Sequence, residues 1–334
     1  MIKKLSMSAL FAVFTIAVLG ATRTVSAEGK TQKVIRIAML APRGSIVERM
    51  FKKMDKELRD ATENEWGIRV YASGVAGDEK DVIRKMRVGQ MDSAIVTTTG
   101  LSQVVRELAV LDTPGIVTSY EDIKKIEKAM WDEWQETFLK NNVKLIRWYP
   151  AGRYRTFTKG NIETWDQLKT RRPWLWPESF IVKELWRATG ATGVPLALPD
   201  VYGALQTGMI DTYVATCVTA VAMQWHTKVD HVQEKAAGVL LLAWVMNKNT
   251  WDSLPQKAKD SINKEANEFA KDSFTVAKRE DEAACKNLLK RGYKLSPTKG
   301  AEKVEKIVRD RVTGRIFSKE LRQRLEQITG HASD

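Results

Sequence analysis

Short apolar runs alternate along the chain with segments whose apolar residues recur at every third or fourth position. Residues 34–40 are rich in β-branched residues, as in a strand, and the next segment repeats apolar residues at helical spacing (Val47, Met50, Phe51, Met54 and Leu58). Strand-like runs follow at 68–72 and 93–97, and between them Asp78 or Asp81 is expected to cap a helix that runs to about Val88. Strands that alternate with helices predict a mostly parallel sheet with helices on both faces.

The loops after these strands are the expected place for a ligand, because ligands of such sheets bind beyond the carboxyl ends of the strands. They comprise residues 41–45, 74–77 and 97–100. The last loop carries Thr97 and Thr98, whose hydroxyls we expect to contact a ligand from the first half of the chain. A run of threonines equally suits an exposed strand end.

The same alternation resumes after a break at residues 150–152. Within it, residues 195–211 predict the end of a strand, a short helix that stops at Gly208, and a new strand. We therefore expect one lobe over residues 28–150 and a second over 151–238.

The last part, residues 239–334, is expected to return to the first lobe. An apolar run at 238–246 predicts a long strand, and residues 254–290 are almost free of helix breakers, which predicts one long helix. A polar helical segment at 301–329 closes the chain.

The first 27 residues have the composition of a secretory signal peptide. Lys3 and Lys4 precede an apolar run at 7–19, and small residues at 25–27 suit a signal peptidase. A membrane anchor is the alternative, but the run is shorter than the ~20 residues that span a bilayer. We expect cleavage after residue 27 and a soluble, periplasmic protein.

The formal net charge of +13 could favour nucleic acid, anionic membranes or anionic solutes. Basic and acidic residues alternate within helical segments, and neither zinc-finger spacing nor an aromatic RNA-binding strand is present, so we expect no nucleic acid partner. Cys217 and Cys285 are expected to be buried free thiols, with one disulfide as the alternative.

The chain lacks the residues of an active site or a metal centre. His226 and His231 are five apart, unlike the i, i+4 pair of a helical metal site, and neither a Gly-x-Ser-x-Gly elbow nor a phosphate-binding loop occurs. We expect no catalysis, no metal and no cofactor.

Four ordered motifs resemble the solute receptors of the tripartite ATP-independent periplasmic (TRAP) transporters. They are residues 73–79 followed by 87–92, the segment Trp165-Asp-Gln-Leu-Lys169, residues 195–211, and residues 247–255. The resemblance implies an α/β, two-lobed periplasmic binding protein fold with mostly parallel sheets, hinge strands and a long connecting helix. It also implies a small organic ligand, often an organic acid, held between the lobes and delivered to two integral membrane subunits.

The resemblance breaks down where the family places an arginine that clamps the carboxylate of its ligand. Depending on the register, Trp174 or Leu175 occupies that position, while Arg171 and Arg172 come a few residues earlier. We therefore expect Trp174 and Trp176, which share one face of a strand, to form an aromatic wall of the site. Packing in the core of the second lobe is the alternative.

Three further residues are candidates through the resemblance. Arg155 matches a second arginine that reaches the ligand, with Arg153 as the competing register. Tyr213 follows Asp211 at a strand end where relatives contact their ligand.

Two other functions remain open. The protein could present its closed form to a signalling receptor, or, with less support, it could be a secreted enzyme on a two-lobed scaffold.

Overall fold

The computed structural model describes residues 32–297 and 299–331, so the signal peptide expected at 1–27 lies outside the described residues. Strand β1 (Lys33–Met39) lies between β2 (Trp66–Tyr71) and β3 (Ser93–Thr97) and runs parallel to both. Strand β9 (Gly238–Asn247) pairs with β3 in the antiparallel direction. We call β1, β2, β3 and the helices that pack on them the first lobe.

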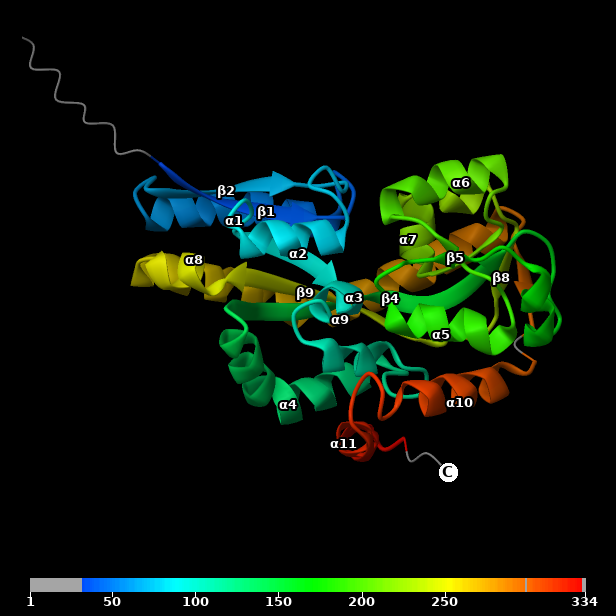
Figure 1. Ribbon diagram of the computed structural model, residues 1–334. Helices are drawn as coiled ribbons and strands as arrows, with labels where there is room; N and C mark the ends of the chain where they lie inside the picture. The colour runs from blue at the N-terminus through cyan, green and yellow to red at the C-terminus, as the bar shows by residue number, and fades with distance from the viewer. Residues whose placement is uncertain (1–31, 298, 332–334) are drawn as a thin grey trace, which may run out of the picture. The chain divides into compact units, whose positions relative to one another are not determined.

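Strand β4 (Val143–Thr158) connects this sheet to a second group of strands (Figure 1). Its first part pairs with β9, and its last residues pair with β7 (Thr212–Ala215) and β8 (His231–Gln233), all antiparallel. The second group is completed by β10 (Lys294–Ser296), parallel to β8, and by the parallel pair β5 (Trp174–Leu175) and β6 (Val194–Pro195). We call β5 to β8, β10 and the helices α5 to α7 the second lobe.

Helices cover both faces of the first sheet, as the alternating pattern predicts. In the first lobe these are α1 (Ile46–Ala61), α2 (Glu79–Arg87), α3 (Thr98–Leu101), the 3-10 helix η1 (Arg106–Asp112) and α4 (Tyr120–Lys140). The second lobe contains η2 (Trp165–Thr170), α5 (Phe180–Thr189), η3 (Leu198–Asp200), α6 (Val201–Thr207), α7 (Cys217–Ala222) and η4 (Trp225–Thr227). The predicted two-lobed α/β fold is confirmed, with the antiparallel pairs confined to contacts of β4 and β9.

The predicted long strand and long helix are both present. They are β9 and α9 (Gln256–Lys290), and α9 is preceded by the short α8 (Lys248–Ser253). The polar segment after residue 300, expected as one helical stretch, is two helices, α10 (Ala301–Val312) and α11 (Lys319–Thr329). Gly314, with φ +78°, turns the chain between them.

The motif at residues 195–211 folds as its sequence predicts. After β6, the chain forms η3 and α6, and Gly208 ends α6 in the left-handed conformation (φ +72°) before β7 begins. A residue with a Cβ is disfavoured at such a helix end, which explains the position of the glycine.

A bulge interrupts β4 where it leaves the first sheet, between Pro150 and Arg153. Gly152 has φ +110°, and a Cβ on it would lie 2.7 Å from Asp281 of α9. This space lets the Asp281 carboxylate accept hydrogen bonds from the backbone N–H of Arg153 (3.0 Å) and of Val218 (3.3 Å). Helix α9 therefore fixes the bend in β4.

The prediction of free thiols was wrong, because Cys217 and Cys285 form a disulfide. It joins the first turn of α7 to the last third of α9, which are 68 residues apart in sequence. Each cysteine lies in an apolar or helical pattern of its own, so the sequence suggested two separate core positions. The pairing depends on the packing of α7 against α9, which those local patterns do not contain.

Candidate functional site

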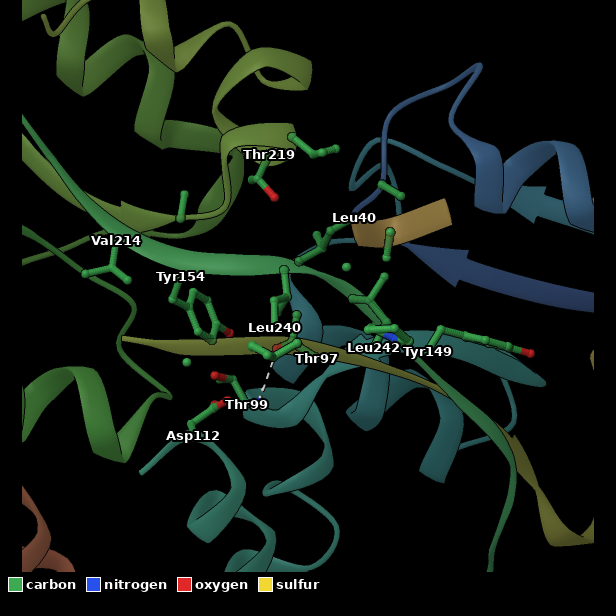
Figure 2. A pocket seen from close by; sticks show the side chains of 18 of the residues that line it. Leu40, Thr97, Thr99, Asp112, Tyr149, Tyr154, Val214, Thr219, Leu240 and Leu242 are labelled. Atoms are coloured by element: carbon green, nitrogen blue, oxygen red, sulfur yellow. Dashed lines mark hydrogen bonds between the residues drawn. The ribbon is translucent and has the colours of Figure 1, made fainter. Parts of the chain in front are cut away.

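A cavity of about 590 Å³ lies between the lobes, within the range of ligand sites in proteins. Its walls are mainly apolar, and they come from the first lobe, the second lobe and the crossing strands β4 and β9. Figure 2 shows Leu40, Val214, Leu240 and Leu242 around it, with Thr97, Thr99 and Asp112 near one another on one side and Thr219 on the opposite side. Two of the expected rim loops, 41–45 and 97–100, contribute to the lining, whereas 74–77 does not.

The two lobes are joined by hydrogen bonds beside the cavity. Asp78, at the start of α2, accepts one bond from the Trp176 indole N–H (3.0 Å) and one from the Leu198 backbone N–H (3.0 Å), both through Oδ2. Its Oδ1 accepts from the Glu79 N–H (2.7 Å) and so caps α2. Because the buried Asp78 carboxylate accepts hydrogen bonds from both lobes, each of its two oxygens has a donor in the closed form.

Further contacts flank this carboxylate. Lys80 of α2 pairs with Glu178 of the second lobe at 3.5 Å, and the Arg106 guanidinium lies over the Phe180 ring at 4.9 Å. The loop at 74–77 also packs here, since a Cβ at Gly74 would lie 3.2 Å from Pro199. This loop lies against Pro199 of the second lobe and does not line the cavity.

Thr97 lies where the sequence placed it, at the cavity wall, and is tied to a buried acid. Its backbone N–H and its hydroxyl donate to Glu79 at 2.7 and 2.8 Å, and its Oγ1 accepts from the Thr99 N–H at 3.1 Å. Burial raises the pKa of Glu79 to about 8, against the opposing effect of these hydrogen bonds. Thr98 is fully buried and does not line the cavity.

Asp112 and Tyr154 complete the polar side of the cavity (Figure 2). Asp112 ends η1, and its Oδ1 is buried without a hydrogen-bond partner among the described residues. Burial raises the pKa of Asp112 to about 7, and that of Tyr154 well above its usual value. Neither residue was predicted. An acid directly after the apolar run 108–111 is the sequence signal that could have indicated Asp112.

Arg155, and not Arg153, lines the cavity. Its guanidinium donates to the backbone carbonyls of Gln233 (3.0 Å) and Glu234, while its Nε has no partner among the described residues. The guanidiniums of Arg171 and Arg172 lie outside the cavity lining, the first on the Lys159 and Asn161 carbonyls and the second near Asp211. No displaced clamp is present among these arginines.

Trp174 and Trp176 stack on each other with ring centres 5.7 Å apart, and both line the cavity. Trp174 is also part of the second-lobe core: its indole N–H donates to the Leu196 carbonyl (2.9 Å), and its edge meets Trp225. The indole N–H of Trp176 is used by Asp78. The two tryptophans therefore line the cavity and also pack in the second lobe. Each ring presents apolar surface to the cavity, and neither indole N–H is free to donate to a ligand.

Tyr213 does not line the cavity. Its ring is fully buried, stacked on Phe157 with centres 4.9 Å apart, and its hydroxyl has no hydrogen-bond partner among the described residues. The strand β7 that carries it contributes the neighbouring residues Val214 and Ala215 to the lining instead. Because successive side chains of a strand point to opposite faces, Val214 points away from the core side that Tyr213 occupies.

The fold and the enclosed cavity define the class of two-lobed binding proteins. The chain belongs to the bacterial extracellular solute-binding proteins, family 7, which match residues 37–316. The resemblance based on the four motifs is thereby confirmed, and the family consists of solute-binding proteins and not of enzymes. In the described part of the chain, no helix combines the length and apolar character that a membrane crossing requires.

Individual relatives are distant in sequence. A solute-binding protein of Chromohalobacter salexigens is 23% identical over 250 residues, 72% of each chain. The sialic acid-binding periplasmic protein SiaP of Vibrio cholerae is 22% identical over 257 residues, 75% of this chain and 78% of its own. The crystal structure of a Bordetella pertussis extracytoplasmic solute receptor binding pyroglutamic acid superposes with a TM-score of 0.80 at 17% identity, covering 89% of this chain and 99% of that one.

Proposed function

We propose that this protein is a periplasmic receptor that closes its two lobes over one small organic molecule and delivers it to the membrane subunits of a TRAP transporter. The observation that carries the proposal is the cavity of about 590 Å³ whose walls come from both lobes. A ligand in this space contacts both lobes at once, so its binding energy favours the closed form. The crossing strands β4 and β9 are the proposed hinge for this motion.

The ligand is proposed to be a small organic molecule with an apolar portion. Relatives of the family bind pyroglutamic acid, D-glucuronate and sialic acid. Here the stacked rings of Trp174 and Trp176 replace the clamp with apolar area, and the unpaired Nε of Arg155 is left to hold a polar or anionic end. Thr97 completes the proposed contacts from the first lobe.

Native mass spectrometry tests the receptor function. The protein is unfolded, freed of ligand, refolded and exposed to an extract of the cells that produce it. We expect a single small molecule bound at one per chain. Deleting the gene should then abolish uptake of that molecule by cells, and restoring it should restore uptake. Absence of any bound molecule, or unchanged uptake, would contradict the proposal.

Export is tested separately. Amino-terminal sequencing of the protein from the periplasmic fraction should begin at or near Glu28, because small residues precede this position. An intact leader in the membrane fraction would contradict the proposed location.

A further inference from the structure

Two polar side chains, Asp112 and Tyr154, lie on one side of the cavity. Asp112 reaches it from the end of η1, and Tyr154 reaches it from β4 (Figure 2). The buried Oδ1 of Asp112 makes no hydrogen bond among the described residues, and the neighbouring Thr98 hydroxyl, which partly offsets the rise that burial causes in the pKa of this carboxyl, does not complete one with it. A buried carboxylate oxygen without a donor destabilises the protein, so a ligand that supplies a donor recovers this free energy.

The positive charges of the lining do not serve Asp112. Among the lining residues, the cations are Arg49, Arg155 and Arg279, and neither lysine nor histidine is present in the described part of the lining. Arg49 donates to the Gly44 carbonyl, Arg155 to the carbonyls of Gln233 and Glu234, and Arg279 pairs with Glu280. None of the hydrogen bonds that these three arginines make among the described residues goes to Asp112.

Two consequences follow for a ligand group placed beside Asp112. At pH 8, above the pKa of about 7 of Asp112, a carboxylate would meet a like charge in an environment of low dielectric, which disfavours both. An ammonium, an amide N–H or a hydroxyl would donate to the free oxygen, and a charged donor would make the stronger bond. The other walls are mainly apolar, with Leu40, Val214 and Leu240 among them, and favour an apolar body.

We propose that the ligand carries a hydrogen-bond donor, cationic or neutral, that Asp112 accepts, at one end of an apolar body. The inference rests on the proposed receptor function and specifies its ligand class. Asp112 takes the place of the arginine clamp as the residue that selects the ligand, and it selects for a group of opposite character. A ligand that also has an acid group meets Arg155 with it.

Three matched probes test the inference: 3-phenylpropylamine, 3-phenylpropanamide and 3-phenylpropanoate, which share a body and differ at one end. Their effects on the melting temperature are measured at pH 8 for the wild type, for Asp112→Asn and for Glu280→Gln. Glu280 is the matched control, because it also lines the cavity but is exposed and paired with Arg279 at 3.0 Å. Calorimetry then gives the Kd of each stabilising probe.

In the wild type and in Glu280→Gln, the amine and the amide should stabilise more than the propanoate. Asp112→Asn should weaken binding of the amine by roughly tenfold or more, so that the amine no longer stabilises the protein more than the propanoate does. The inference is overturned if the propanoate stabilises most, if Asp112→Asn keeps the wild-type ranking, or if no probe stabilises the protein. If native mass spectrometry still finds a bound acid without a donor, the receptor function stands and only the ligand class falls. If it finds no ligand at all, the receptor function falls as well.

Discussion

The indole N–H of Trp176 should control how firmly the two lobes close. It donates to Asp78 Oδ2 at 3.0 Å across the interface of the lobes. Trp176→Phe keeps an aromatic ring against Trp174 and removes only the donor, and it leaves the cap of α2 by Asp78 Oδ1 intact. The variant should therefore shift the protein toward the open form without unfolding either lobe.

The size of the shift follows from the kind of hydrogen bond. Bonds to a charged group contribute about 1.5–3 kcal/mol, and partial exposure of Trp176 lowers this to about 1–2 kcal/mol. The ratio of open to closed molecules should rise by about 5- to 30-fold. Ligand affinity should fall by up to the same factor, because binding must then supply the free energy of closure.

Electron–electron double resonance between one spin label on each lobe measures the populations. Val88, at the end of α2, and Met209, after α6, are suitable sites because they are 64% and 53% exposed. Trp134→Phe is the control, since its buried indole N–H has no hydrogen-bond partner among the described residues. Trp176→Phe should add a population at longer distance that the control lacks. Identical distance distributions in the two variants would refute the role of Asp78 and Trp176.

Three further changes test separate parts of the structure. Arg155→Ala should weaken a captured ligand by about 2–5 kcal/mol in calorimetry with an unchanged melting temperature, and equal affinity would leave Arg155 without a binding role. The pKa of Glu79 is raised to about 8, so the folded state holds a proton that the unfolded state releases, and stability should fall as the pH rises from about 4.5 to 8. Urea unfolding at several pH values should show that the free energy of unfolding depends less on pH in Glu79→Gln than in the wild type. The same pH dependence in both proteins would show that Glu79 is ionised in the fold. Replacing Cys217 and Cys285 by serine should cost about 2–4 kcal/mol of unfolding free energy, and a reductant should lower the melting temperature of the wild type but not of this variant.

The fold could be predicted from the sequence because its signals are local. The spacing of apolar residues indicated α1 and α9, and Gly208 marked the end of α6. The disulfide and the antiparallel course of β4 depend on which elements meet in space. Neither feature can be inferred from a short stretch of sequence, so both became evident only in the structure.

The site could be predicted in part, since Trp174 and Trp176 line the cavity. Thr97 and Arg155 line the cavity as expected, yet the hydrogen bonds that engage Arg155 come from Gln233 and Glu234, far along the chain. Tyr213 and Val214 show why a sequence motif does not fix the lining residues of β7: Tyr213 lies in the core, whereas the next residue, Val214, lines the cavity. Asp112 was not predicted, because what distinguishes it is a carboxylate oxygen without a hydrogen-bond partner among the described residues, which a sequence does not display.

A crystal structure of the protein with its captured ligand tests the central claim most directly. We expect electron density for one molecule enclosed between the lobes, with a donor group at hydrogen-bond distance from Asp112 and an apolar part against Trp174 and Trp176. Density for the ligand on the outer surface, with the cavity between the lobes free of it, would contradict the account.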